Sequence, residues 1–339
     1  MEIRNRCRKL ITFVEDKLRR GKNRTGSGLL PARLSLQEIK EVAKFRNALL
    51  MTDQNRQPEA GGTFPVLAPK KRFPGVGDLF AMLGIVLGMQ VVAGVVLTVG
   101  FTLAGWVPGR LNPAQQGIFT ALAYVLSMLP AYLAVIWYRR MRGGGGPLGR
   151  FAVRGLNPVL LLWAFVFMMA AGVVCEPLLS WLPAPGDLDY GTGLWAVLTL
   201  VVAAPVLEEL LCRGLVLESL RTRFGVVAAW LLSSLFFGVL HLQPMLVVNA
   251  FIIGLILGYI YMVTDSLWAS MILHALNNGI AYLMMTSGRG DLLLTDMIGN
   301  RTLYWSIYIG AAAVTLVSGW MVWRTLRRLK DRAENPVLE

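Results

Sequence analysis

Long runs of apolar residues, separated by short polar stretches, fill the chain after residue 75. Each run contains about 20 residues or more, the length that an α-helix needs to cross the hydrocarbon core of a bilayer. A membrane-spanning segment must satisfy its own backbone hydrogen bonds, so helices fit such runs. The pattern therefore predicts an all-α polytopic membrane protein with about eight transmembrane helices. The predicted segments are 79–106, 117–138, 159–182, 193–219, 225–243, 246–264, 266–286 and 303–323.

The composition excludes two other classes of protein. Residues of the set AVILMFWYC make up 55% of the 339 residues, only 16% are charged, and the mean hydropathy is +0.56. A soluble domain carries about 25% charged residues, and a disordered chain has few aromatic residues, whereas this chain has 14 Phe and 10 Trp. Its three cysteines, Cys7, Cys175 and Cys212, show neither metal-ligand nor disulfide spacing.

Positive charge is concentrated before the first apolar segment. The formal net charge is +13, and residues 1–75 hold 17 Lys and Arg against 7 Asp and Glu. We interpret 1–75 as a basic cytoplasmic extension and linker that contacts anionic lipids, 76–324 as the membrane domain and 325–339 as a cytoplasmic tail. Nucleic acid is the other partner that a basic segment favours, and it is not expected next to a membrane domain.

Arginines in the loops predict the orientation of the membrane domain. Clusters of arginine follow the second, fourth and eighth apolar segments, whereas the loop after the third contains Asp187 and Asp189 and no Lys or Arg. With a cytoplasmic N-terminus, eight crossings place all three clusters on the cytoplasmic side, in agreement with the positive-inside rule. Both termini are therefore predicted to be cytoplasmic.

Most of the apolar segments lack charged residues, but the fourth contains three of them. Glu208, Glu209 and Arg213 follow Pro205, which is expected to kink the helix. One charge at the centre of a transmembrane helix costs about 2.5–3.5 kcal/mol on insertion scales, so three charges need partners or water. Glu209 and Arg213 are four residues apart and can form an ion pair on one face. Glu208 is rotated by about 100° from Glu209 and has no evident local cation, so a purely structural role fits it poorly.

The two histidines of the chain both lie in later apolar segments. His241 ends the fifth segment, and His274 stands in the seventh with Asn278 four residues later on the same helical face. Together with Glu208 they provide a general base and groups that hold water and stabilise an oxyanion, which suits attack of activated water on a carbonyl. The alternative is a zinc site formed by Glu208, His241 and His274. The metal-free scheme is favoured, because no HExxH helix is present.

Three motifs in successive segments resemble the signature of the CPBP intramembrane proteases, a family that groups CaaX prenyl endopeptidases with bacteriocin-processing and self-immunity proteins. The motifs are Glu208-Glu209-x-x-x-Arg213, Phe237-x-x-x-His241 and His274-x-x-x-Asn278. The resemblance covers about 191–286, in the fourth to seventh predicted helices, and excludes residues 1–75. It implies that Glu208 activates the water. It also implies that the water and the oxyanion are bound by His241, His274 and Asn278, and that the site is shaped by Glu209, Arg213 and Phe237.

The resemblance implies an intramembrane endopeptidase, of glutamic or metallo type, that cleaves near the C-terminus of a lipidated, CaaX-like protein or in a leader or membrane-anchored peptide. The expected location is the cytoplasmic membrane of a bacterium, and no cofactor is expected unless the zinc scheme holds. Two other classes stay open. A non-catalytic scaffold, partner-binding or immunity protein of the same fold is disfavoured because all motif residues are intact. An ion-coupled transporter is disfavoured because the carboxylates form one cluster instead of marking two halves.

Overall fold

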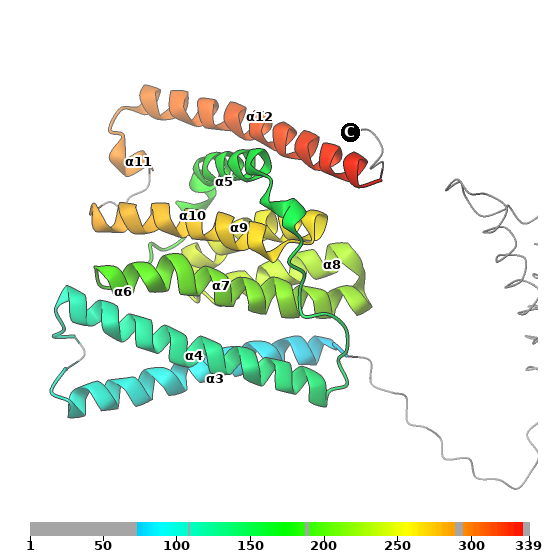
Figure 1. Cartoon of the computed structure of the whole chain (residues 1–339). Coiled ribbons are helices and arrows are strands. Elements are labelled where there is room, and N and C mark those ends of the chain that lie inside the picture. Colours follow the sequence, from blue (N-terminus) through cyan, green and yellow to red (C-terminus); the bar gives the residue numbers. More distant parts are fainter. Residues whose placement is uncertain (1–72, 108, 187–189, 289–293, 335–339) are drawn as a thin grey trace, which may run out of the picture. The chain divides into compact units, whose positions relative to one another are not determined.

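The structure is a computed structural model that describes residues 73–107, 109–186, 190–288 and 294–334; the predicted basic extension lies almost wholly outside these residues. All regular elements in the described ranges are helices (Figure 1). In chain order they are α3 (Val76–Leu103), α4 (Pro113–Met141), the 3₁₀-helix η1 (Val153–Leu156), α5 (Pro158–Leu179), α6 (Leu194–Val197), the π-helix η2 (Leu198–Ala203), α7 (Ala204–Glu209), the π-helix η3 (Leu210–Leu217), α8 (Glu218–Val239), α9 (Pro244–Thr264), α10 (Leu267–Thr286), α11 (Leu294–Met297) and α12 (Arg301–Glu334).

Each predicted apolar segment coincides with a helix or with part of a helical run, which confirms the all-α membrane fold. In the described part of the chain, six helices are long and apolar enough to cross a membrane. The number differs from eight because the fourth and fifth segments form one 46-residue helical run, Leu194–Val239, and because α10 is not among the six. The long run is divided at Gly225, whose φ of 79° and ψ of 176° are not helical. The protein is an integral multi-pass membrane protein, and the count of eight stays a prediction.

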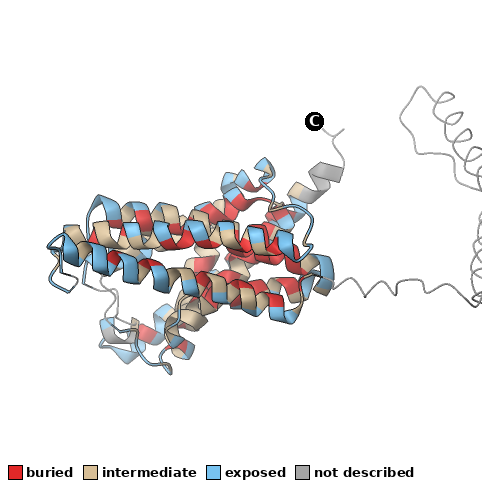
Figure 2. Ribbon diagram, turned by 90° about the horizontal axis from the view of Figure 1, so that it is seen from below, coloured by how far each residue is buried: buried red, intermediate tan, exposed pale blue. Residues whose placement is uncertain are grey.

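The outward faces of the helices are apolar. Val95, Leu316 and Trp320 are all more than half exposed. Figure 2 shows buried residues on the faces between helices and exposed residues on the outside. A helix that is apolar on both its inner and its outer face fits a lipid environment and not water.

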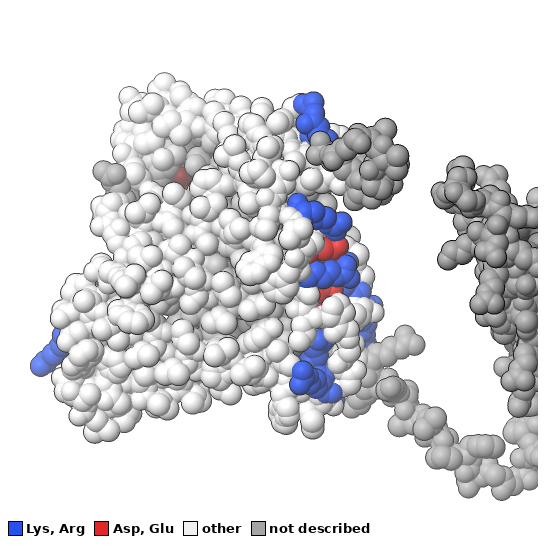
Figure 3. Space-filling view, viewed as in Figure 1, with Lys and Arg blue, Asp and Glu red and all other residues white. Residues whose placement is uncertain are grey.

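Charged side chains gather at one end of the helices. On the face visible in Figure 3 most of them lie at the end where α4 and α12 finish, with one basic group at the opposite end. Figure 1 places the start of α3 at the end where most of them lie. Here Arg142 pairs with Asp78 at 2.8 Å. Asp265, between α9 and α10, pairs with Arg150 at 3.1 Å and with Arg154 at 2.6 Å. The arginine-rich loops thus share one end, as the predicted topology requires.

Glycines let α8 and α9 pack closely behind the candidate site. Gly254 and Gly258 have the spacing typical of close helix contacts in membranes. A Cβ at Gly254 would lie 3.2 Å from the ring of Phe237, and a Cβ at Gly258 would lie 3.0 Å from the indole of Trp230. A larger residue at either position would therefore push the two helices apart. The close approach also brings the Gly254 carbonyl within reach of a side chain in η3.

Reporter fusions can test the number of crossings. A reporter fused after Asp265 should lie on the same side as one fused after Arg328, and opposite to one fused after Pro185. Both α8 and α10 must cross the membrane for this pattern to occur. The measurement is the activity of fused alkaline phosphatase compared with the fluorescence of fused green fluorescent protein. If the fusions after Asp265 and Pro185 report the same side, eight crossings are ruled out.

Candidate active site

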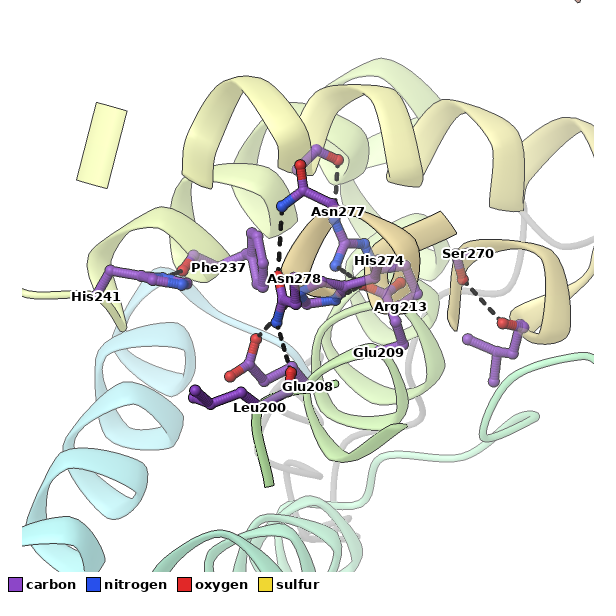
Figure 4. Close-up of polar contacts among 12 residues, drawn as sticks. Leu200, Glu208, Glu209, Arg213, Phe237, His241, Ser270, His274, Asn277 and Asn278 are labelled. Atoms are coloured by element: carbon purple, nitrogen blue, oxygen red, sulfur yellow. Dashed lines mark hydrogen bonds and ion pairs between the residues drawn. The ribbon is translucent and has the colours of Figure 1, made fainter. Parts of the chain in front are cut away.

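The predicted site residues are carried by neighbouring segments of the helical core. Figure 4 shows five of them clustered and His241 set to one side. The cluster comprises Glu208 and Glu209 at the end of α7, Arg213 in η3, and His274 and Asn278 in α10. The helical run is π-helical on both sides of α7, over η2 and η3. Such turns are rare in proteins and frequently occur at functional sites.

Pro205 explains the contact that holds Asn278. Proline has no N–H group to donate. In η2 the first amide of α7 donates to the carbonyl of Thr199, five residues back. In this register the donor to the next carbonyl, that of Leu200, would be the amide of residue 205, and proline has none. The Asn278 side chain supplies one, because its Nδ2 donates to the Leu200 oxygen at 2.9 Å. The predicted disturbance at Pro205 is therefore a change of hydrogen-bond register that fixes the position of a site residue.

Glu209 and Arg213 form a fully buried ion pair. Both side chains are 0% exposed, and Arg213 Nη1 donates to Glu209 Oε1. Arg213 Nη2 donates to the carbonyl of Gly254 at 2.9 Å, and its guanidinium lies 4.7 Å from the centre of the Phe237 ring. A buried charge needs such partners, because its desolvation would otherwise cost several kcal/mol. The arrangement fits the predicted site-shaping role of these residues.

His274 lies between the two glutamates. Its Nδ1 is 3.2 Å from Glu209 Oε1, and its Nε2 is 3.7 Å from Glu208 Oε2. Because the ion-paired Glu209 carboxylate can only accept, Nδ1 carries the proton of this hydrogen bond. The ring of Phe237 meets His274 edge to face, with 5.4 Å between the ring centres. These contacts fix the orientation of the imidazole and leave Nε2 facing Glu208.

Glu208 differs from its neighbour in its partners and its accessibility. Its side chain is 13% exposed, whereas the side chain of Glu209 is fully buried. Tyr124 of α4 donates its hydroxyl to Glu208 Oε1 at 2.7 Å. Tyr190, in the loop before α6, lies close enough for the Glu208 carboxylate to raise its pKa, in addition to the larger rise caused by burial. Of the two glutamates, Glu208 is the one that water or a substrate can reach.

His241 is the predicted site residue that lies apart from the cluster. Its Nδ1 donates to the Phe237 carbonyl at 3.0 Å, and its ring meets that of Phe237 edge to face. The described residues contain no group of three His, Cys, Asp or Glu side chains placed to hold a metal ion. Among the described residues, Glu208, His241 and His274 are therefore not gathered into one group of ligands.

Tyr124 makes a contact in the site that could not be predicted from the sequence. It stands in the second predicted segment, 84 residues before its partner Glu208. A tyrosine in the middle of an apolar helix is a weak signal by itself, although a buried phenol usually has a hydrogen-bond partner. The identity of the partner depends on how α4 packs against α7, and no motif in the sequence records that packing.

Comparison with known proteins supports the predicted family. Residues 190–280 match the family model described as type II CAAX prenyl endopeptidase Rce1-like. The matched segment runs from the residue before Gly191 into α10 and contains every predicted site residue, whereas Tyr124 lies outside it. Neither the curated proteins nor the solved structures include a match to this chain.

Proposed function

The chain belongs to the CPBP family of intramembrane proteases through residues 190–280, and from this premise we propose that it hydrolyses peptide bonds with water activated by Glu208. The proposed substrate is a lipidated, CaaX-like protein cleaved near its C-terminus, or a leader or membrane-anchored peptide. Supporting this, the two adjacent glutamates have opposite environments. Glu209 is fully buried and forms an ion pair with Arg213. Glu208 is partly accessible and faces His274. A general base must reach its water, so Glu208 fits that role.

In the proposed reaction, Glu208 takes one proton from a water molecule as the water oxygen attacks the carbonyl carbon of the scissile bond. The carbonyl oxygen becomes an oxyanion on a tetrahedral carbon. When the carbon–nitrogen bond breaks, Glu208 returns the proton to the leaving amine, so the carboxylate is regenerated. Proton transfer of this kind contributes about 10²–10⁴-fold to a rate.

The oxyanion would be stabilised by groups on α10. The doubly protonated form of His274 presents Nε2–H on the side of Glu208, and the Glu209 carboxylate at Nδ1 balances its charge, as a buried aspartate does in a catalytic triad. Asn278 Nδ2 has two hydrogens and uses one for Leu200, so the second is available. Donors held in place before the reaction stabilise developing charge with little reorganisation.

His241 would contribute from the edge of the site. Since its Nδ1 donates to Phe237, a neutral His241 keeps the lone pair of Nε2 for a hydrogen bond from water. We assign it to orienting the attacking water once substrate is bound. Zinc is not required by this scheme. Anionic lipids are the proposed partner of the basic residues 1–75, and a bacterial cytoplasmic membrane with cytoplasmic termini is the proposed location.

Sequencing of new protein C-termini tests this proposal. Membranes from cells that contain the protein, lack it or contain its Glu208→Gln variant should be compared by mass spectrometry. We expect a set of C-termini found only with the parent protein, and their positions will distinguish CaaX-like cleavage from cleavage of leader or anchor peptides. If the three membranes give the same C-termini, the protease proposal fails and a non-catalytic role takes its place.

A further inference from the structure

We propose that Tyr124 is a positioning residue that assigns different tasks to the two oxygens of Glu208; this inference rests on the proposed function. The Tyr124 hydroxyl donates to Oε1 at 2.7 Å, and Oε2 faces His274 Nε2 at 3.7 Å. A phenol has one proton to donate, and a carboxylate oxygen only accepts it. Oε1 is therefore held by α4, and Oε2 is left to take the proton from water.

A fixed Oε1 matters because Glu208 has a long side chain with several rotatable bonds. A base needs its acceptor oxygen within about 2.6–3.2 Å of the water that it activates. Without Tyr124, Glu208 would lose the hydrogen bond to Oε1, and the His274 ring on its other side lies at 3.7 Å, which is too long for a direct hydrogen bond. The hydrogen bond from the Tyr124 hydroxyl therefore fixes the orientation of the Glu208 carboxylate. Site geometry generally depends on such supporting contacts.

The chain contains a matched control on the same helix. Tyr138 of α4 donates its hydroxyl to Asp78 Oδ1, also at 2.7 Å. It lies 14 residues from Tyr124, or about 21 Å along the helix, at the end rich in charged residues. Tyr138→Phe therefore removes the same kind of tyrosine–carboxylate bond from the same helix and leaves Glu208 untouched.

The test compares Tyr124→Phe and Tyr138→Phe in the purified full chain, with a peptide whose cleavage by the parent has been established by C-terminal mass spectrometry. We expect Tyr124→Phe to lower kcat by about 10–100-fold, the range found for supporting contacts that orient metal ligands in enzymes. KM should not change, and Tyr138→Phe should keep the parental kcat. In the Glu208→Gln background, Tyr124→Phe should cause no further loss, because there is no base left to position.

Three results would overturn the assignment. They are a parental kcat in Tyr124→Phe, an equal loss in Tyr138→Phe, and an equal further loss in the Glu208→Gln background. If Tyr124→Phe does not fold, 4-aminophenylalanine and 4-fluorophenylalanine at position 124 both keep a substituent on the ring, and only the amino compound can donate to Oε1. Activity should then stay near the parental value with the amino compound and fall with the fluoro compound, and equal kcat values for the two would also overturn the proposal. Failure of the proposed function is distinct, since Glu208→Gln would then cleave like the parent.

Discussion

Glu208→Gln is expected to give a folded protein that binds substrate but cleaves it about 10²–10⁴-fold more slowly than the parent. Glutamine keeps the size of the side chain and one oxygen for the Tyr124 hydroxyl, but it cannot take a proton from water. The change also removes a charge from a membrane helix, where charge is costly, so insertion should not suffer. The measurements are kcat with the identified peptide, substrate binding, and the amount of protein recovered from membranes.

Removal of metal provides the control for this prediction. The parent enzyme should keep its activity after dialysis against a strong chelator if Glu208 acts as a base without metal. Loss of activity that zinc restores would assign Glu208, His241 and His274 to a metal and contradict the scheme. Cleavage by Glu208→Gln at the parental rate would contradict it too, and would favour the non-catalytic reading of the fold.

The helices could be predicted because a segment that crosses a bilayer must be apolar over its whole span. The residues at which the helices begin and end could not be predicted. The first segment was predicted to begin at 79, after the charge of Asp78. In the structure Asp78 lies inside α3 and accepts the amide of Gly75, which caps the helix start. The last segment was predicted to end at 323, yet α12 continues to Glu334. Helix ends depend on local hydrogen bonds, and hydropathy records only the part that lies in lipid.

Within the site, the contacts that could be predicted are those inside one helix. The spacing of Glu209 and Arg213 places them on one face, and the structure pairs them. Adjacent helical residues point about 100° apart, which allowed Glu208 to be separated from this pair. The position of His274 between the two glutamates could not be predicted, because it depends on how α10 is aligned with α7. The contact of Tyr124 with Glu208 could not be predicted either, because it depends on how α4 packs against α7.

Residue types alone could not show whether the site works with a metal ion or without one. Glutamate and histidine serve both a metal-free site and a zinc site, so the sequence left both schemes open. In the structure His274 Nδ1 donates to Glu209, a contact that metal-bound histidines also make, and His241 lies beside Phe237. The chelator experiment therefore decides between the two schemes.

Arg213→Ala is expected to have the largest effect on folding. The substitution leaves the carboxylate of Glu209 buried without its main cation, and it removes the donor to the Gly254 carbonyl. Loss of one partner from a buried pair costs about 3–5 kcal/mol, a large part of the stability of most proteins. The amount of protein in membranes and its melting temperature in detergent should both fall, and activity should fall with them.

Arg150→Ala is the matched control. Arg150 pairs with Asp265 at 3.1 Å, but its side chain is 45% exposed and Arg154 also pairs with Asp265; an exposed pair contributes only about 0–1 kcal/mol. A double variant, Glu209→Leu with Arg213→Leu, separates folding from catalysis. It leaves neither charge unpaired, so protein yield should recover relative to Arg213→Ala. Activity should stay low, because His274 Nδ1 has then lost the carboxylate that orients it. A stable, fully active Arg213→Ala protein would show that the pair is dispensable, and a fully active double variant would show that Glu209 does not position His274.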